Sequence, residues 1–359
     1  MSTTRRGALL AGAGAALSLT LAGRAHAGPG GRAKGPRLTV GRDGSGDFTT
    51  VQAAVDATPD HPRQPWTIVL APGVYRETVQ IPEAKTGLTL LGGTGDPRDT
   101  VIVHDNAAGT PKPDGSGTYG TSGSATVTAR PDGFTARRIT FANDWLRADH
   151  PEITSGTQAV AIKVMGDRSL FDRCRFLGHQ DTLYADTRDA RLTARQLFHR
   201  CYVEGDVDFV FGRATAVLHG CELRTLDRDV DFTPYGFVFA PSTAAGTRYG
   251  YLAHRCRFTT TAPAGAYKLA RPWVPSSDPD AHPRLVVRDS VLGAGIDAGA
   301  PYANMREQYP WQGFFFREHA NRGPGAAVTD PANRPQLTAA QAAGHTPAAY
   351  LGDWRPAVR

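Results

Sequence analysis

Two aspartates lie in apolar segments of this chain. Asp181 occurs in the run Gly178-His-Gln-Asp-Thr-Leu-Tyr184, and Asp208 in Val207-Asp-Phe-Val-Phe-Gly212. A carboxylate is costly to bury without a partner, so an aspartate inside such a segment suggests a functional role. Two carboxylates, with an amide such as Gln180 beside one of them, can supply a nucleophile, a general acid and an oxyanion donor for acyl transfer. The alternative is that each aspartate ends a strand and hydrogen-bonds a turn.

The composition indicates which elements must position these residues. The chain of 359 residues contains 40 glycines and 26 prolines, and long helical patterns are scarce. Its length suits one large domain or two average ones. Many short strands and turns in one all-β body are therefore expected.

A repeated pattern narrows the fold further. Each repeat is interpreted as a short strand with a small residue at an equivalent place, and cysteines fill four of these places, at irregular intervals. Irregular periods of this kind are typical of stacked β-coils, whereas a β-sandwich would need hairpin turn signals every 8–12 residues or so. The prediction is a parallel β-helix. The repeats are 134–141, 170–176, 197–203, 217–223, 252–258 and 285–291.

The four cysteines are expected to be small core residues of this solenoid. Stacked coils stand about 4.8 Å apart, which would also allow a cross-link between neighbouring coils in an exported protein. We predict a Cys201–Cys221 disulfide, with Cys174 and Cys256 free and buried. No Cys-x-x-Cys or His-x-x-x-His spacing occurs, so no zinc site is expected.

The N-terminus has the features of a signal peptide over residues 1–27. Arg5 and Arg6 precede a small, apolar stretch, and Ala25-His26-Ala27 fits a cleavage site. The paired arginines favour the twin-arginine route, although a Sec signal can also carry two arginines. The segment is too short for a membrane anchor, and no other segment reaches spanning length. The prediction is a secreted protein without a membrane partner, with residues 28–37 as a flexible lead-in.

Removal of residues 1–27 takes away three arginines and no acidic residue, which lowers the formal net charge from +6 to +3. A mildly basic exported protein suits a polyanionic substrate.

Several ordered motifs resemble the pectin methylesterases. The resemblance runs from about Leu38 to Pro356, so residues 38–359 are expected to form one catalytic domain. No single motif is specific to this family, but the motifs together and in this order are. The motifs are 46–54, 73–77, 124–127, 158–162, the two aspartate runs, Leu269-Ala-Arg-Pro-Trp273, 315–318, 323–326 and 351–356.

This resemblance implies a single-stranded, right-handed parallel β-helix that hydrolyses the methyl esters of polygalacturonate to pectate and methanol, without metal or cofactor. It also implies pectin (homogalacturonan) as the partner, no nucleic-acid partner, and a monomer. The implied catalytic roles are nucleophile for Asp208, general acid and base for Asp181, and oxyanion donors for Gln158 and Gln180. Arg271 would pair with the nucleophile. The implied sugar-groove residues are Trp273, Tyr184, Phe211 and Thr121.

The chemistry fits these residue types. A bidentate Arg271 would keep Asp208 ionised by depressing its pKa, and a negative Asp208 would raise the pKa of Asp181 so that it holds a proton. Aromatic faces stack on pyranose rings. Taken singly, Arg271 could be a surface turn residue, Trp273 a cap of the solenoid, and Gln158 a buried amide in a polar ladder.

Two features depart from the family pattern. Ala270 stands where glycine is usual, which would add a methyl group near the groove. The interval between Asp181 and Asp208 is longer than usual, with 187–195 as the expected extra turn and an altered groove wall as its consequence.

Other functions are less well supported. A pectate lyase needs a calcium-binding carboxylate cluster, a polygalacturonase needs three close aspartates, and a Ser-His-Asp esterase needs a Gly-x-Ser-x-Gly elbow. None of these is visible in the sequence. A β-helix that only binds polysaccharide, or an esterase with a non-pectin substrate, remains the alternative.

Overall fold

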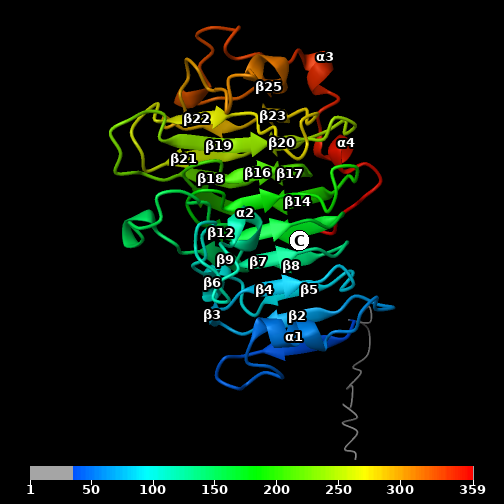
Figure 1. Cartoon of the computed structure of the whole chain (residues 1–359). Helices are drawn as coiled ribbons and strands as arrows, with labels where there is room; N and C mark the ends of the chain where they lie inside the picture. The colour runs from blue at the N-terminus through cyan, green and yellow to red at the C-terminus, as the bar shows by residue number, and fades with distance from the viewer. Residues whose placement is uncertain (1–34, 359) are drawn as a thin grey trace, which may run out of the picture. The chain divides into compact units, whose positions relative to one another are not determined.

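The computed structural model describes residues 35–358, and these form a stack of coils, each contributing strands to up to three parallel sheets (Figure 1). Every pairing between named strands is parallel. The predicted all-β, right-handed parallel β-helix is confirmed. The proposed signal peptide lies outside the described residues. The first strand already begins at Arg37, the last residue assigned to the lead-in.

The first sheet runs the full length of the stack. Its strands follow one another in chain order, one per coil, because each coil returns to this face before the next begins. The strands are β1 (Arg37–Val40), β2 (Thr67–Leu70), β5 (Thr89–Gly92), β8 (Thr135–Arg137), β11 (Ser169–Asp172), β14 (Arg195–His199), β17 (Thr215–His219), β20 (Tyr251–His254), β23 (Arg284–Arg288) and β25 (Phe315–His319).

The second sheet follows the first after a tight turn in most coils. Its strands are β3 (Gly73–Arg76), β6 (Thr100–His104), β9 (Thr140–Asn143), β12 (Arg175–Leu177), β15 (Tyr202–Gly205), β18 (Glu222–Thr225), β21 (Arg257–Thr260) and β24 (Val291–Leu292).

The third sheet completes the coil and carries the candidate site. Its strands are β4 (Val79–Ile81), β7 (Val127–Ala129), β10 (Ile162–Val164), β13 (Leu183–Ala185), β16 (Val210–Gly212), β19 (Gly236–Pro241) and β22 (Tyr267–Ala270). The helices are short: α1 (Val51–Ala57), α2 (Gly120–Gly123), α3 (Ala339–Ala342) and α4 (Pro347–Leu351), with 3-10 turns at Pro97–Asp99, Arg147–Asp149, Trp311–Gly313 and Pro324–Ala326.

The sequence repeats are two strands each, where one strand was predicted. In the repeat 170–176, for example, β11 ends at Asp172, Arg173 turns the chain with φ 55°, and β12 begins at Arg175. A left-handed residue changes the chain direction sharply, so the following small residue enters the core of the next face. The same turn follows β8, β14, β17, β20, β23 and β25.

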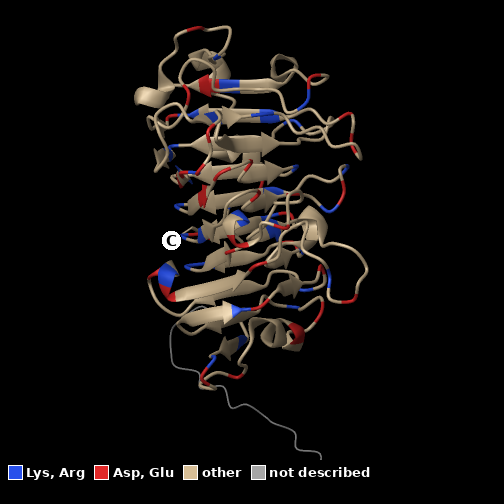
Figure 2. Cartoon of the chain, turned by 60° about the vertical axis from the view of Figure 1, so that its left-hand side comes forward, with Lys and Arg blue, Asp and Glu red and all other residues tan. Residues whose placement is uncertain are grey.

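The core is a continuous apolar column inside the coils. Aromatic rings stack along it, as at Phe171 and Phe198, whose ring centroids are 5.0 Å apart. Figure 2 shows that acidic and basic residues gather at strand ends and in loops, around largely uncharged strands. A second apolar cluster covers the outer face of the first sheet, where α4 contributes Tyr350 and Leu351.

The predicted Cys201–Cys221 disulfide is wrong for this structure, because all four cysteines are buried and free. The Cys201 thiol donates to the carbonyl oxygen of Phe171 at 3.5 Å, and the Cys221 thiol to that of Phe198 at 3.2 Å. Each sulfur therefore points at backbone of the preceding coil. Within residues 35–358, no helix has the length and apolar character needed to cross a membrane.

Candidate active site

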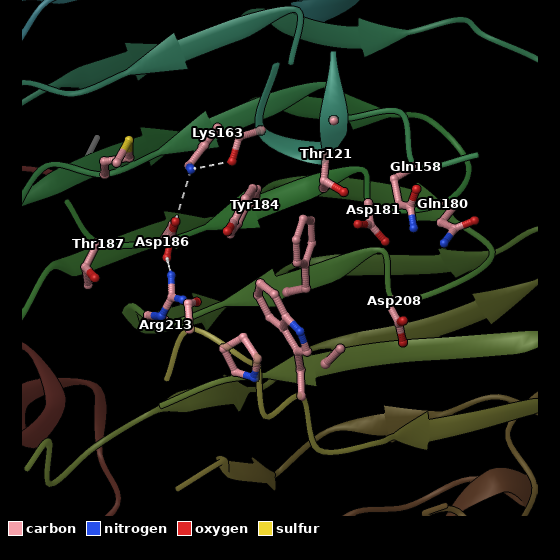
Figure 3. A pocket seen from close by; sticks show the side chains of 18 of the residues that line it. Thr121, Gln158, Lys163, Gln180, Asp181, Tyr184, Asp186, Thr187, Asp208 and Arg213 are labelled. Carbon is pink, nitrogen blue, oxygen red and sulfur yellow. Dashed lines mark hydrogen bonds and ion pairs between the residues drawn. The ribbon is translucent and has the colours of Figure 1, made fainter. Parts of the chain in front are cut away.

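A cavity of about 730 Å³ lies over the third sheet. All nine residues predicted from the sequence for catalysis or sugar binding line it, although they come from positions 121 to 273 of the chain. These are Thr121, Gln158, Gln180, Asp181, Tyr184, Asp208, Phe211, Arg271 and Trp273. Figure 3 shows Gln158 and Gln180 beside Asp181, with Asp208 on the neighbouring coil.

Asp181 and Asp208 occupy equivalent positions on successive coils. Each lies two residues before its strand of the third sheet, β13 or β16, and each has a left-handed backbone, with φ of 67° and 50°. The Asp181 amide donates to the carbonyl oxygen of Val207 at 2.9 Å, which ties the two turns together. Non-glycine residues rarely adopt this backbone, and such residues cluster at functional sites.

Arg271 binds Asp208 through two hydrogen bonds. Its Nε donates to Asp208 Oδ1 at 2.9 Å and its Nη2 to Oδ2 at 2.6 Å. The guanidinium also lies 4.1 Å from the ring centroid of Phe237. Arg271 directly follows β22, so the neighbouring strands of the third sheet set this geometry. The predicted pairing is present, and Arg271 is not a free surface turn residue.

Burial decides the pKa of both aspartates. Asp181 and Asp208 are 7% and 6% exposed. Burial, followed by the charge of Asp208, raises the pKa of Asp181 well above its usual range. Burial also raises the pKa of Asp208, although Arg271 opposes it. The expectation of a depressed Asp208 pKa is therefore wrong, because desolvation outweighs the arginine; the larger rise at Asp181 agrees with the prediction.

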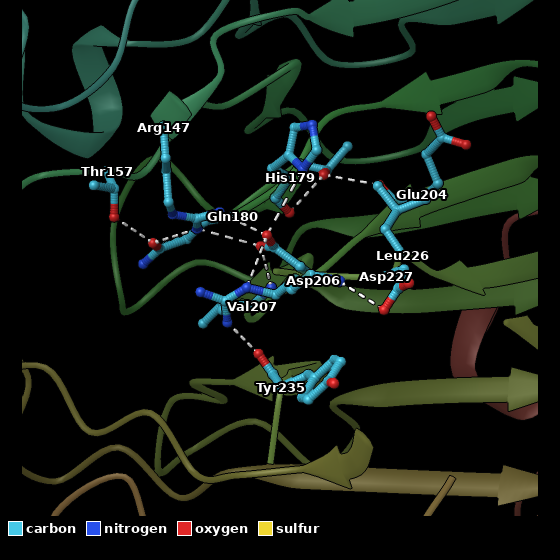
Figure 4. Close-up of polar contacts among 12 residues, drawn as sticks. Arg147, Thr157, His179, Gln180, Glu204, Asp206, Val207, Leu226, Asp227 and Tyr235 are labelled. Carbon is cyan, nitrogen blue, oxygen red and sulfur yellow. Dashed lines mark hydrogen bonds and ion pairs between the residues drawn. The ribbon is translucent and has the colours of Figure 1, made fainter. Parts of the chain in front are cut away.

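Gln180 is oriented by neighbours that the sequence reasoning did not identify (Figure 4). Its Oε1 accepts from Thr157 Oγ1 at 2.7 Å and from Arg147 Nη2 at 3.1 Å. Both partners are donors, so they fix the amide oxygen and leave the Nε2 group to donate elsewhere. The 3-10 turn Arg147–Asp149 and the strand-like segment before β10 carry these partners.

Arg147 is held in turn by Asp206, which is fully buried two residues before Asp208. Arg147 Nη1 lies 2.6 Å from Asp206 Oδ2, and His179 Nδ1 lies 3.7 Å from the same oxygen. Burial raises the pKa of Asp206, but His179 and Arg147 outweigh it and hold the pKa well below its usual range. Its closeness in sequence to Asp208 was the signal that could have revealed Asp206.

Three aromatic rings form one wall of the cavity. Tyr184 and Phe211 stack with centroids 4.1 Å apart, and Trp273 lies 5.6 Å from Phe211. Tyr184 and Phe211 are almost fully buried, whereas Trp273 is half-buried. Trp273 therefore offers the most ring surface to a ligand, and it does not cap the solenoid.

The other end of the cavity carries charged residues that the sequence reasoning also missed. Asp186 lies 3.2 Å from Lys163 Nζ and 3.2 Å from Arg213 Nη1 (Figure 3). From the predicted extra turn, 187–195, Thr187 and Arg188 line the cavity.

The methyl group of Ala270 does not lie at the groove, where the sequence comparison with the family pattern had placed it. Ala270 is fully buried and does not line the cavity, so its methyl group packs in the core below the groove.

Among residues 35–358, no cluster of three or more His, Cys, Asp or Glu side chains has the arrangement of a metal site.

Comparison with known proteins decides the family. The pectinesterase family model matches residues 37–353. The chain belongs to the pectinesterase family. A pectinesterase of Ralstonia solanacearum is 32% identical over 320 residues, which cover 80% of this chain and 79% of that protein.

Solved structures of the family share the fold. The pectin methylesterase of Erwinia chrysanthemi is 30% identical with a TM-score of 0.79, covering 92% of this chain and 100% of its own. A pectin methylesterase solved in complex with a hexasaccharide is 31% identical, also with a TM-score of 0.79, covering 91% and 100%. The pectinesterase described here accordingly hydrolyses the methyl esters of pectin.

Proposed function

We propose that Asp208 is the nucleophile of this pectinesterase and Asp181 its general acid and base. The observation that carries the assignment is the difference between the two carboxyl groups. Arg271 holds both oxygens of Asp208 and favours its ionised form, whereas Asp181 has the more strongly raised pKa and favours its protonated form. Two carboxyl groups whose environments separate their pKa values divide into a nucleophile and an acid.

In the first step, an Asp208 oxygen attacks the ester carbonyl carbon. The negative charge moves to the carbonyl oxygen, where the amide groups of Gln158 and Gln180 donate to it. Collapse of this intermediate breaks the bond to the methoxy oxygen, which takes the proton of Asp181 and leaves as methanol. The product is an acyl-enzyme anhydride on Asp208.

In the second step, the ionised Asp181 takes a proton from water, and the resulting hydroxide attacks the acyl carbon. The anhydride bond breaks, Asp208 leaves as a carboxylate, and the sugar is released as a carboxylic acid, which gives its proton to the solvent. Asp181 is again protonated, so the cycle is balanced.

The substrate is proposed to be homogalacturonan, bound along the cavity against the aromatic wall. The hexasaccharide complex of a related pectin methylesterase supports a polysaccharide ligand. Trp273, Tyr184, Phe211 and Thr121 are the proposed sugar contacts. We also propose that the protein is secreted through its N-terminal signal and acts as a monomer.

The two roles can be separated with an activated ester of galacturonate. A good leaving group needs little protonation, so single-turnover alcohol release should be partly rescued in Asp181→Asn. No rescue is expected in Asp208→Asn, which lacks the nucleophile and should lose about 10⁴-fold or more in kcat/KM on pectin. Equal rescue of both variants, or rescue of Asp208→Asn alone, would contradict the assignment.

A further inference from the structure

The turns between the first and second sheets carry a row of arginines. Arg173, Arg200 and Arg255 each directly follow a strand of the first sheet and have φ between 52° and 55°. The equivalent position on the coil between Arg200 and Arg255 is Gly220, with φ 65°. The row is therefore built at one repeated backbone position, and we call it the arginine edge.

Backbone hydrogen bonds hold the arginine edge in register. The amides of Arg173, Arg200 and Gly220 donate to carbonyl oxygens of the next coil at 2.9 to 3.0 Å. Adjacent coils stand about 4.8 Å apart, so Arg200 and Arg255 are separated by about 10 Å at their backbones. Below an ionic strength of about 0.1 M the Debye length is 10 Å or more, so the potentials of neighbouring arginines then overlap.

The arginines of this edge are exposed and lack carboxylate partners. Arg173, Arg200 and Arg255 form no ion pair with any residue from 35 to 358, and neither do the nearby Arg257 and Arg322. About half of the other arginines between residues 35 and 358 are in ion pairs, as Arg98 is with Asp96 and Arg288 with Asp289. Unpaired guanidinium groups in a row leave a positive field over this edge.

Two adjoining hollows follow the edge. One of about 490 Å³ is lined by Arg173, Arg175 and Arg200, and the other of about 780 Å³ by Arg255, Arg257 and Arg322. Gly220 and Glu222 line both hollows. The two hollows therefore meet at Gly220, where the row of arginines has a gap. The three carboxylates present are Asp96, Glu222 and Asp289, and two of them are already paired with arginine.

We propose that the arginine edge binds polygalacturonate, the de-esterified form of the polymer, through its free carboxylates. A linear chain with one carboxylate per sugar matches a linear row of guanidinium groups, which bind carboxylates with two parallel hydrogen bonds. No residue lining the hollows lines the catalytic cavity. The edge would thus hold de-esterified stretches while the cavity acts on esterified ones. This proposal rests on the proposed function, because the reaction creates those carboxylates.

The test compares two variants that each lose two positive charges. Arg200→Gln/Arg255→Gln removes charge from the edge. Arg63→Gln/Arg248→Gln removes it from two exposed arginines that likewise have no ion pair within residues 35–358. Affinity for fully de-esterified polygalacturonate is measured by calorimetry at low and high salt. We expect about a tenfold loss at low salt for the edge variant, less than twofold for the control, and convergence at high salt.

A gain-of-function variant provides the second arm. Gly220→Arg would fill the gap in the row at a backbone position that already accepts arginine on other coils, and a Cβ there would meet only Arg200 Cγ at 3.7 Å. We expect it to bind polygalacturonate at least twofold more tightly. With fully methyl-esterified pectin, measured with Asp208→Asn added to every variant so that no ester is cleaved, all variants should bind alike.

The proposal is overturned if the edge variant loses no more affinity than the control, if Gly220→Arg gives no gain, or if fully esterified pectin shows the same losses. Polygalacturonate carries no methyl ester, so this binding measurement does not depend on catalysis. A failure of the proposed catalytic roles would appear in the ester assays alone.

Discussion

Two edges of this β-helix have turns with the same left-handed backbone conformation, but they place charged side chains in different environments. Between the second and third sheets, left-handed residues place Asp181 and Asp208 in the cavity, where both are buried. Between the first and second sheets, left-handed residues place Arg200 and Arg255 in solvent. The turn determines only the position from which the side chain projects; it does not determine whether the side chain is buried or exposed. What surrounds that point decides whether the charge is costly and reactive, or solvated and available for a polyanion.

The largest expected effect is a loss of activity when the hydrogen bonds around Gln180, beside the two aspartates, are changed. Gln180→Ala removes a proposed oxyanion donor and should lower kcat on pectin by about 10²–10³-fold. Arg147→Gln keeps that donor but removes one of the two groups that hold its amide oxygen and leaves Thr157 as the other, so kcat should fall by about tenfold with little change in KM. Methanol release under steady-state conditions measures both.

The matched control for these variants is Gln336→Ala, a change at an exposed glutamine outside the cavity. If Arg147→Gln raised KM and left kcat unchanged, Arg147 would serve substrate binding and would not position Gln180.

The second effect tests whether burying the ionised carboxylate of Asp181 lowers the stability of the folded protein. Because the folded-state pKa of Asp181 is raised, the folded protein binds this proton more tightly than the unfolded chain does. The resulting stabilisation is present below the unfolded pKa, about 3.9, and is lost as the pH rises through the folded pKa. Asp181→Asn avoids the buried charge and should raise the Tm at pH 7.5 by about 2–4 °C.

This gain should shrink as the pH falls toward 4, which thermal melts across that range will show. Asp229→Asn, at an exposed site, is the control. An equal gain at all pH values would mean that the substitution acts through packing and not through the charge.

The smallest effect concerns the histidines beside the arginine edge. His254 precedes Arg255, and its Nδ1 lies 2.9 Å from Nδ1 of His219, an arrangement that needs one neutral ring. Burial, then the charge of His219, lowers the pKa of His254 to about 4, with Asp289 opposing and Arg288 assisting. The stabilisation is therefore present above the unfolded pKa, about 6.5, and is lost as the pH falls through 4.

His254→Gln should flatten this loss of stability between pH 6.5 and 4 by about 1 kcal/mol, a figure reduced for the partial exposure of the ring. Chemical denaturation at several pH values measures it, with His61→Gln as the exposed control. If both variants gave the same slope, the histidine pair would not contribute to acid sensitivity.

The sequence by itself was enough to predict the coil and the residues that line the cavity. Equivalent small residues at 174, 201, 221 and 256 are typical of a solenoid, and the aspartates in apolar runs indicated the turns that line the cavity. Periodicity and residue type are local properties, so they can be read along one chain. The strand pairs within each repeat were missed, because a left-handed arginine leaves no sequence signal comparable to glycine.

Only the tertiary structure decided the properties that depend on neighbours from other coils. Burial outweighed Arg271 at Asp208, and Arg147 and Thr157 oriented Gln180. The thiol of Cys201 donates to a carbonyl oxygen and forms no disulfide with Cys221. Each outcome is a balance of desolvation, charge and hydrogen-bond direction among groups far apart in sequence. Spacing along the chain predicts which residues can meet, but it does not determine the environment in which they meet.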